Sequence, residues 1–128
     1  MFAFGSQDTA FVSPRHALYP HMTVFKNVQG DLVLRGWSAD EIKARTKEME
    51  SWPWLSPIFY RACRELTKEE LYLAALARAL APGPEKLLVE LPEDPSPSIS
   101  QALEHIKDIT TITITPKKAG TAWNTQIA

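Results

Sequence analysis

The sequence predicts an α/β domain in which a small parallel sheet of three strands is joined to a helical subdomain. Two apolar stretches, Ala10-Phe11-Val12 and Leu87-Leu88-Val89, and a β-branched stretch over residues 109–115 have the composition of strands. Stretches with helical periodicity and capping residues separate them. The order strand, helices, strand, helix, strand favours parallel pairing, because each helical crossover returns the chain to the same end of the sheet.

The first half of the chain enters the helical part soon after its first strand. Residues 7–13 contain that strand, and Ser13-Pro14 ends it because proline restricts its neighbour and offers no amide donor. Thr23 can cap a helix that runs toward Leu34. Gly36 supplies the backbone freedom that ends this helix.

A capping box opens the next helix. Ser38 accepts from the first-turn amides, and Glu41 reaches back to the amide of Ser38. The helix runs to about Ser51, and Ser56-Pro57 is expected to begin another helical turn with proline at its favoured first position. The tryptophans of this region are expected to fill a small core, with an aromatic binding surface as the alternative: Trp37, Trp52 and Trp54.

The clearest helix begins after residue 67. Thr67 and Glu70 form a second capping box, and Pro82-Gly83-Pro84 ends the helix. Alanines raise its helix propensity. Its larger apolar residues share one face at helical spacing: Leu73, Leu76, Ala77 and Leu80.

The last helix and strand complete the predicted sheet. Ser98, with Gln101, is expected to cap a helix whose apolar residues are Ile99, Leu103 and Ile106. In the strand that follows, Ile112 and Ile114 face one way and the threonines face the other. This alternation predicts a sheet that is buried on one side only.

Composition argues against several classes of partner. The chain of 128 residues has a net charge of −1, so bulk charge does not attract nucleic acid or an anionic membrane. Lys117-Lys118 is too short to form a binding stripe. Charges and prolines interrupt every apolar run, so no membrane insertion is expected. The stretch Met1-Phe2-Ala3-Phe4-Gly5 lacks the basic start of a signal peptide.

No candidate for catalysis or metal binding emerges from the residues themselves. Cys63 is the only cysteine, which favours a reducing compartment, and we expect a half-buried thiol rather than a nucleophile. The histidines share no ligand spacing: His16, His21 and His105. Glu90 could hold a metal or pair with Lys117 or Lys118, but a strand end with its carboxylate in solvent is the simpler interpretation.

Several segments together resemble sugar-importer-type ABC transporter ATPases. Ala17-Leu18-Tyr19-Pro20-His21-Met22-Thr23-Val24 is similar to the segment after the Q-loop in that family. Ala75-Leu76-Ala77-Arg78-Ala79-Leu80 resembles the signature helix, and Leu87-Leu88-Val89 with Pro92 resembles the Walker B strand. Residues 109–115 resemble the strand that leads to the H-loop. The matches run in family order, so the resemblance implies a remnant of the P-loop ABC ATPase fold.

The positions that handle phosphate in the family differ here. The family's signature loop reads Leu-Ser-Gly-Gly-Gln, and its glycines let backbone amides approach the nucleotide. This chain has Leu66-Thr67-Lys68-Glu69-Glu70 at that place. The long side chains at both glycine positions would block that approach, and the two glutamates would repel a polyanion.

The other catalytic positions differ as well. By the same resemblance the Q-loop glutamine falls on Pro14, the Walker B aspartate on Glu90, the catalytic glutamate on Leu91 and the H-loop histidine on Pro116. No Gly-x-x-x-x-Gly-Lys-Ser/Thr occurs in the sequence. We therefore expect a degenerate, N-terminally truncated ABC ATPase that is not an enzyme, has no catalytic residue and binds neither a cofactor nor a metal.

The resemblance also implies a docking surface. In the family, the segment after the Q-loop receives the coupling helix of the membrane subunit. We therefore predict that this chain docks to a protein partner through five consecutive residues: Leu18, Tyr19, Pro20, His21 and Met22. Internal packing of these residues is the alternative. The expected partner is a permease subunit or an intact ABC ATPase, at a cytoplasmic location that is membrane-associated only through that partner.

Alternative functions and the domain boundaries complete the sequence-based predictions. The chain could be a structural subunit of a complex unrelated to transport, or could pair with a second copy of itself. An enzyme with new chemistry is disfavoured, and a decayed gene product that still folds stays open. We expect one domain over residues 1–115, with a helical subdomain over about 20–65, and a C-terminal tail over residues 116–128.

Overall fold

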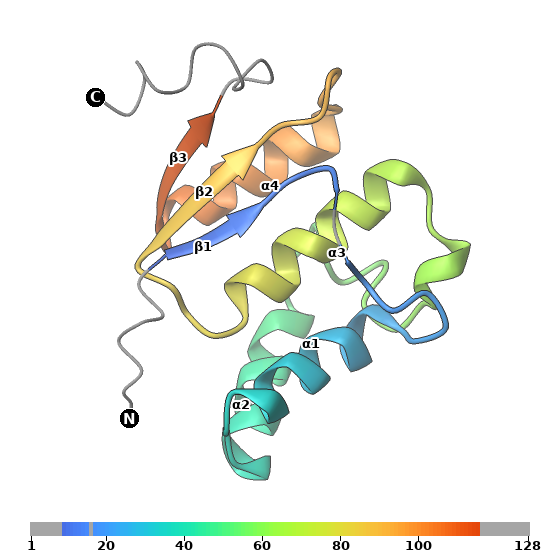
Figure 1. The fold of residues 1–128 in the computed structure, drawn as a ribbon, viewed down its shortest axis with the longest axis vertical. Helices are drawn as coiled ribbons and strands as arrows, with labels where there is room; N and C mark the ends of the chain where they lie inside the picture. Colours follow the sequence, from blue (N-terminus) through green and yellow to red (C-terminus); the bar gives the residue numbers. More distant parts are fainter. Residues whose placement is uncertain (1–8, 16, 116–128) are drawn as a thin grey trace.

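The computed structural model describes residues 9–15 and 17–115 of the chain. Three parallel strands form its sheet in the order β1-β2-β3 (Figure 1): β1 (Thr9–Val12), β2 (Lys86–Glu90) and β3 (Thr111–Thr115). The register places Phe11 beside Leu88, and Leu88 beside Thr113. The predicted fold class, a small parallel three-stranded sheet with helices, is therefore confirmed.

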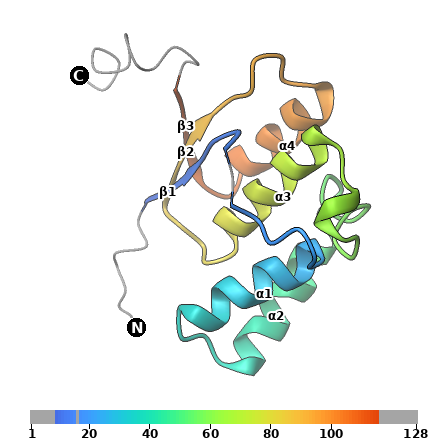
Figure 2. The ribbon, with the colours of Figure 1, turned by 45° about the vertical axis from the view of Figure 1, so that its right-hand side comes forward.

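Helices accompany the sheet in the predicted order. The described residues form α1 (Val24–Leu34), α2 (Ala39–Glu50), α3 (Lys68–Leu80) and α4 (Pro97–Lys107). In both ribbon views α1 and α2 lie together on the side of the molecule nearest β1, apart from α4 (Figures 1 and 2). Helix α3 packs on α1, on α4 and on β1, so it joins the helical lobe to the sheet.

Among the described residues, helices cover one face of the sheet and no element covers the other. Helices α3 and α4 lie on the same side of the sheet (Figure 2). Val12, Leu87 and Val89 point to that side and are buried. On the opposite face the side chain of Phe11 is 59% exposed. The one-sided burial expected from the Ile/Thr alternation is confirmed, although Ile114 keeps 48% of its surface exposed at the end of β3.

The local signals at the helix starts agree with the structure. Thr23 caps α1 by accepting from the amide of Lys26 at 3.0 Å. Ser38 and Glu41 form the predicted capping box of α2. After α1 the chain turns at Gly36, whose φ of 87° favours glycine because a side chain would strain it. These contacts join residues three positions apart, which is why sequence reasoning finds them.

The expected helical turn at Ser56-Pro57 is wrong. The chain forms successive turns from residue 53 to residue 60 and then a short 3₁₀ helix, η2 (Cys63–Glu65). The buried residues Leu55, Ile58 and Phe59 keep helical spacing, but the backbone does not form a continuous helix. Its bonds here are mostly between residues three apart, such as the amide of Ile58 to the carbonyl of Leu55 at 3.0 Å.

The tryptophan cluster packs inside the molecule, as expected. Trp52 and Trp54 are buried, and Trp37 packs against the core from its edge. Trp54 Nε1 donates to Nδ1 of His105 at 2.9 Å, and the Trp52 ring lies 5.3 Å from the His105 ring. The cluster therefore fastens the turns after α2 to α4, which the sequence did not reveal.

Two boundaries in the second half need correction. Ser96, not Ser98, caps α4 by accepting from the amide of Ile99 at 3.2 Å, and Pro97 takes the first helical position. Strand β3 begins at Thr111, because the amide of Ile109 still bonds the carbonyl of Ile106 in the last turn of α4. The positions of His16, Pro116, Lys117, Lys118 and Trp123 lie outside the described residues.

Candidate functional site

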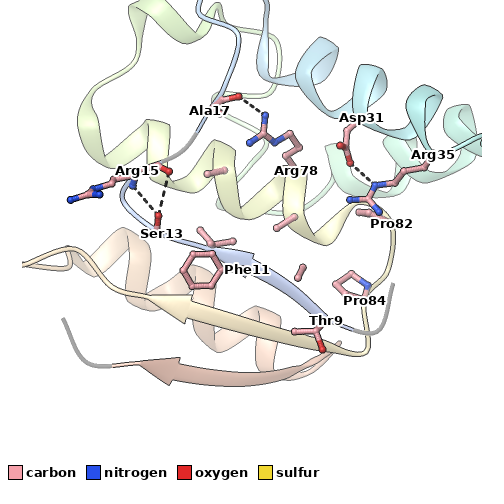
Figure 3. A pocket seen from close by; sticks show the side chains of 14 residues that line it. Thr9, Phe11, Ser13, Arg15, Ala17, Asp31, Arg35, Arg78, Pro82 and Pro84 are labelled. Atoms are coloured by element: carbon pink, nitrogen blue, oxygen red, sulfur yellow. Dashed lines mark hydrogen bonds and ion pairs between the residues drawn. The ribbon is translucent and has the colours of Figure 1, made fainter. Parts of the chain in front are cut away.

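A groove of about 480 Å³ separates the edge of the sheet from the helical lobe. Residues 9–13 form one wall, and α3 lies opposite with Ala75, Arg78 and Ala79 (Figure 3). The far end is closed by α1 through Asp31 and Arg35. Because three separate segments meet there, tertiary packing creates the groove and no local motif predicts it.

The groove is rich in positive charge. Arg15, Arg35 and Arg78 line it, and Asp31 is the single acidic side chain among its lining residues. Asp31 Oδ2 accepts from Arg35 Nε at 2.8 Å. Arg78 Nη1 donates to the carbonyl of Ala17 at 2.8 Å, which is a neutral partner. The groove therefore favours negatively charged groups.

The wall made by β1 is the edge of the sheet. Within the described part of the chain, β1 pairs only with β2, so its other side faces the groove. Consecutive residues from Thr9 to Ser13 all line the groove, as expected where backbone rather than one face of side chains is presented. Phe11 adds an exposed aromatic ring at this edge (Figure 3).

The predicted docking residues lie just past the groove, on the segment that leads into α1. Leu18 is half-buried and packs against the core, so internal packing holds for this residue. The other four side chains are exposed, and the fractions are 60% for Tyr19 and 43% for Met22. Internal packing is therefore wrong for Tyr19, Pro20, His21 and Met22, and no contact tests their docking role.

Buried Asn27 fixes the shape of this segment. Its Oδ1 accepts from the amide of Tyr19 at 2.7 Å, and its Nδ2 donates to the carbonyl of Thr23 at 2.9 Å. The same Nδ2 lies 3.4 Å from Sγ of Cys63. Backbone bonds from the amide of Cys63 to the carbonyl of Met22 add a second attachment. The exposed side chains are thus presented by a rigid backbone.

The N-terminal turn of α3 is filled by its own side chains. Thr67 Oγ1 accepts from the amide of Glu70 at 3.1 Å, and Glu70 Oε1 accepts from the amide of Thr67 at 3.0 Å. Glu70 also lies 3.6 Å from Arg61. These bonds satisfy the amides of Thr67 and Glu70, and the negative charge of Glu70 is favourable at the start of a helix.

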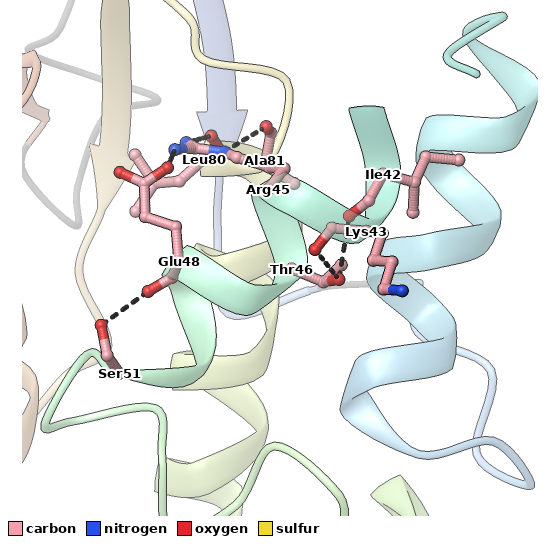
Figure 4. Close-up of polar contacts among 8 residues, drawn as sticks. All are labelled: Ile42, Lys43, Arg45, Thr46, Glu48, Ser51, Leu80 and Ala81. Carbon is pink, nitrogen blue, oxygen red and sulfur yellow. Dashed lines mark hydrogen bonds and ion pairs between the residues drawn. The ribbon is translucent and has the colours of Figure 1, made fainter. Parts of the chain in front are cut away.

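The C-terminal end of α3 is closed by Arg45 of α2. Arg45 Nη2 donates to the carbonyl of Leu80 and Nε donates to that of Ala81, each at 2.8 Å (Figure 4). The guanidinium also lies 5.5 Å from the Trp52 ring centroid and pairs with Glu48. Arg45 therefore satisfies terminal carbonyls of α3 and ties the two helices together.

The remaining predicted positions show no cooperating chemistry. Pro14 is exposed in the bend after β1, and Leu91 packs against the core. The carbonyl of Glu90 accepts from the Tyr72 hydroxyl at 2.7 Å. Burial, and then the charge of Glu90, raise the pKa of Tyr72 well above its ordinary value, so the phenol stays protonated.

Cys63 is fully buried, deeper than the half-buried thiol that was expected, and is not placed to react. Burial raises the pKa of its thiol, an effect that the positive charge of Arg78 partly offsets. Among the described residues, no group of three or more His, Cys, Asp or Glu side chains could hold a metal ion. None of the helices in residues 9–15 and 17–115 has both the length and the apolar character needed to cross a bilayer.

Sequence reasoning missed the groove. Arg78 and Ala75 were predicted only as part of the segment that resembles the signature helix. Phe11, Arg15 and Arg35 were not predicted as site residues. One signal was available, because Arg78 interrupts a run of small and apolar residues in a helix that is otherwise buried over residues 72–77. An arginine on an otherwise apolar helix usually packs its stem on apolar surface and extends its guanidinium to solvent.

Comparisons with known proteins agree with the resemblance. No protein-family model matches the chain. It is 36% identical over 86 residues to the molybdate/tungstate import ATP-binding protein of Pyrococcus abyssi and to the trehalose/maltose import ATP-binding protein of Thermococcus litoralis. These matches cover 67% of this chain but only 25% and 23% of those relatives. The chain thus spans about a quarter of the length of the curated relatives it matches.

Solved structures show the same fold. The chain matches CbiO1 of Clostridium perfringens, a part of the ABC transporter complex cbiONQ, with a TM-score of 0.71 and 19% identity over 87% of this chain and 48% of that chain. It matches the ATP-binding cassette MJ0796, in a dimeric post-hydrolysis state with ADP and Pi, with a TM-score of 0.63 and 23% identity over 84% and 52% of the two chains. The chain is ABC-ATPase-like in fold, and its relatives are ATP-binding subunits of importers.

Proposed function

We propose that this chain is a non-catalytic ABC-ATPase-like protein that docks to a protein partner through residues 18–22 and the adjoining groove. The observation that carries the proposal is the segment held by Asn27, which presents Tyr19 and Met22 to solvent on a fixed backbone. Exposed aromatic and methionine side chains on rigid backbone are typical of binding anchors, because little entropy is lost when they bind.

A subunit of a transporter is the partner that best fits this proposal. The relatives are named as import ATP-binding proteins. We infer that such proteins act together with other subunits of the importer. The equivalent segment in the resembling family receives the membrane subunit. We therefore propose a permease subunit or an intact ABC ATPase as the partner, and a cytoplasmic location at the membrane through that partner.

The absence of catalysis is part of the proposal and rests on substituted positions. Glu69 and Glu70 place two negative charges in the first turn of α3, where they would repel a phosphate. Leu91 stands where the family has its general base, and a leucine side chain accepts no proton. Since the relatives are ATP-binding proteins, this part of the proposal needs a direct measurement.

Docking is tested by co-expression. The full chain is co-expressed with the membrane and ATP-binding subunits of importers from its native source, and the complex is purified on a tag. We expect Tyr19→Ala and Met22→Ala each to weaken a complex about tenfold, the typical loss of one anchor. Leu34→Ala is the matched control, because Leu34 is 84% exposed but lies at the end of α1. Equal loss in all three variants, or no complex with any importer subunit, contradicts docking.

Nucleotide binding is tested separately by titration calorimetry. The full chain, at micromolar concentration, is titrated with Mg-ATP, and we expect no heat of binding. Phosphate release should stay at the level of buffer. Saturable binding with one site per chain would show that the capping box does not exclude nucleotide, and the non-catalytic part of the proposal would then be wrong while the docking part would stand.

A structural role in a larger assembly is the second candidate. The open face of the sheet supports it, because parallel sheets usually have both faces covered and Phe11 is exposed on this one. We propose residues 1–115 as the folded unit in either case, with residues 116–128 as a tail. Light scattering distinguishes the candidates, since a concentration-dependent dimer that Phe11→Ser abolishes would favour assembly through this face over docking through residues 18–22.

A further inference from the structure

We propose that the groove binds an extended acidic segment of the partner, which adds as a strand to the free edge of β1. This inference rests on the proposed docking function and names the chemistry of the partner. The edge of β1 and the arginines opposite it are separate observations, and together they select both the conformation and the charge of the occupant.

The conformation follows from the edge. In a parallel ladder alternate residues direct their N–H and C=O groups to opposite sides of the strand. Within the described residues β1 is paired on one side only, so alternate residues present unpaired donors and acceptors to the groove. A segment of roughly four residues in extended conformation matches β1 in length and satisfies these groups.

The charge follows from the opposite side of the groove. Arg78 is bonded there to the neutral carbonyl of Ala17. Asp31 is paired with Arg35 at 2.8 Å. Arg15 follows β1 on the other side, and its guanidinium is directed away from Arg78 (Figure 3). An occupant with carboxylates gains a charge-assisted hydrogen bond from Arg78, and a basic occupant would be repelled by the net positive charge of the lining.

The charge of this chain's own tail does not match the groove. Residues 116–128 contain Lys117 and Lys118 and no acidic side chain. Residues 1–8 run directly into β1 and contain one aspartate, Asp8, next to its first residue. The charge of the groove therefore favours a segment from another protein over either end of this chain.

The test uses a random twelve-residue peptide library displayed on phage and selected on the full chain. We expect enrichment of β-branched peptides that carry Asp or Glu. A resynthesised peptide should bind about tenfold more weakly to Arg78→Gln, the loss expected for one charge-assisted hydrogen bond. Lys47→Gln is the control, because it removes an exposed positive charge from α2, away from the groove. Phe11→Ser, a second groove variant, should also weaken binding.

Backbone methylation tests strand addition itself. N-methylation of one alternate set of peptide amides should abolish binding, and methylation of the other set should leave it within about twofold, because only one edge of a strand pairs with β1. Enriched peptides with helical spacing, neutral or basic peptides, equal effects of both methylated sets, or no enrichment would each overturn the inference. The docking proposal would survive those results if Tyr19→Ala still disrupted the importer complex, and would fall if it did not.

Discussion

The N-terminal turn of α3 and the flank of α3 that carries Arg78 differ in how their polar groups are satisfied. At the N-terminal turn, Thr67 and Glu70 bond each other's amides, so the chain supplies its own anion. On the flank, the guanidinium of Arg78 donates to the carbonyl of Ala17, in a groove with net positive charge. The polar groups of the turn bond each other, whereas Arg78 bonds a carbonyl 61 residues away in sequence and lines the groove.

The C-terminal end of α3 extends this comparison. Arg45 donates to two carbonyls there and packs on Trp52, whereas Arg78 donates to one carbonyl and faces the groove. The two arginines thus differ in their contacts: Arg45 joins α2 to the end of α3, and Arg78 lines the groove in which we propose that a partner binds. The predictions that follow remove one of these contacts at a time.

Arg45→Ala should have the largest effect on stability. It removes two charge-assisted hydrogen bonds to Leu80 and Ala81 and the contact with Trp52, so the free energy of unfolding should fall by about 2–3 kcal/mol. Urea denaturation followed by tryptophan fluorescence measures the change. Lys43→Ala is the control on the same helix and should change stability by less than about 0.5 kcal/mol. Equal values for the two variants would show that Arg45 does not close α3.

Opening the N-terminal turn should destabilise the chain without creating a nucleotide site. The double variant Lys68→Gly, Glu69→Gly restores the two glycines of the family pattern, and it should cost about 1–2 kcal/mol because glycine disfavours helix. Calorimetry with Mg-ATP should still show no binding, since Glu70 keeps its bond to Thr67. A gain of Mg-ATP affinity would mean that the two side chains alone had closed the site.

Thr67→Ala should cost about 1 kcal/mol, the usual loss of a capping side chain. The hydroxyl no longer accepts from the amide of Glu70, and that amide is left to water. Urea denaturation measures the loss, with Thr67→Ser as the conservative variant that should restore most of it. If the Thr67→Ala protein were as stable as the wild type, the capping hydroxyl would not contribute to stability.

Arg78→Gln should change stability little, by about 0.5–1 kcal/mol, because it removes one partly exposed hydrogen bond. Its measured effect on acidic peptides should be larger than its effect on folding, whereas Arg45→Ala should show the reverse. Measuring stability and peptide affinity for both variants distinguishes the role of Arg78 from that of Arg45. If the two variants lost stability and peptide affinity to similar extents, Arg45 and Arg78 would not have separate roles.

The capping box of α2 gives the smallest effect, which appears with pH. The amide and hydroxyl of Ser38 bond Glu41 and lower the pKa of its carboxyl below the ordinary value of 4.5. A carboxylate with a lower pKa in the folded state stabilises the fold above its unfolded pKa, and this contribution disappears as the pH falls through the folded value. Glu41→Gln should therefore lose less stability than the wild type between pH 6 and pH 3 in urea titrations. A wild type and a variant with parallel pH profiles would contradict this.

Local signals predicted the helix starts at Thr23, Ser38 and Thr67 and the three strands, but not every boundary. Ser98 was expected to cap α4, but the helix begins two residues earlier, with Ser96 as its cap and Pro97 at the first helical position. The helical turn expected at Ser56-Pro57 was wrong because residues 53–60 form successive turns with bonds mostly between residues three apart. The helical spacing of the buried residues there did not by itself produce a helix.

The candidate site was predicted only in part, for the same physical reason. The resemblance identified residues 18–22, and exposure of Tyr19 and Met22 is consistent with that role. The groove itself was not predicted, because its walls come from residues 9–13, 31–35 and 75–84. Nothing in the spacing of these segments along the chain indicates that they meet.

The sequence by itself determined the strand and helix order, three of the helix caps, and which side chains, such as Glu69 and Leu91, stand at the positions compared with the resembling family. These features depend on bonds between residues a few positions apart, or on residue identity alone. Only the tertiary structure decided that Arg45 closes α3, that Asn27 holds the exposed segment and that β1 borders a positively charged groove. Such contacts join residues far apart in sequence, and they exist because packing the core brings their elements together.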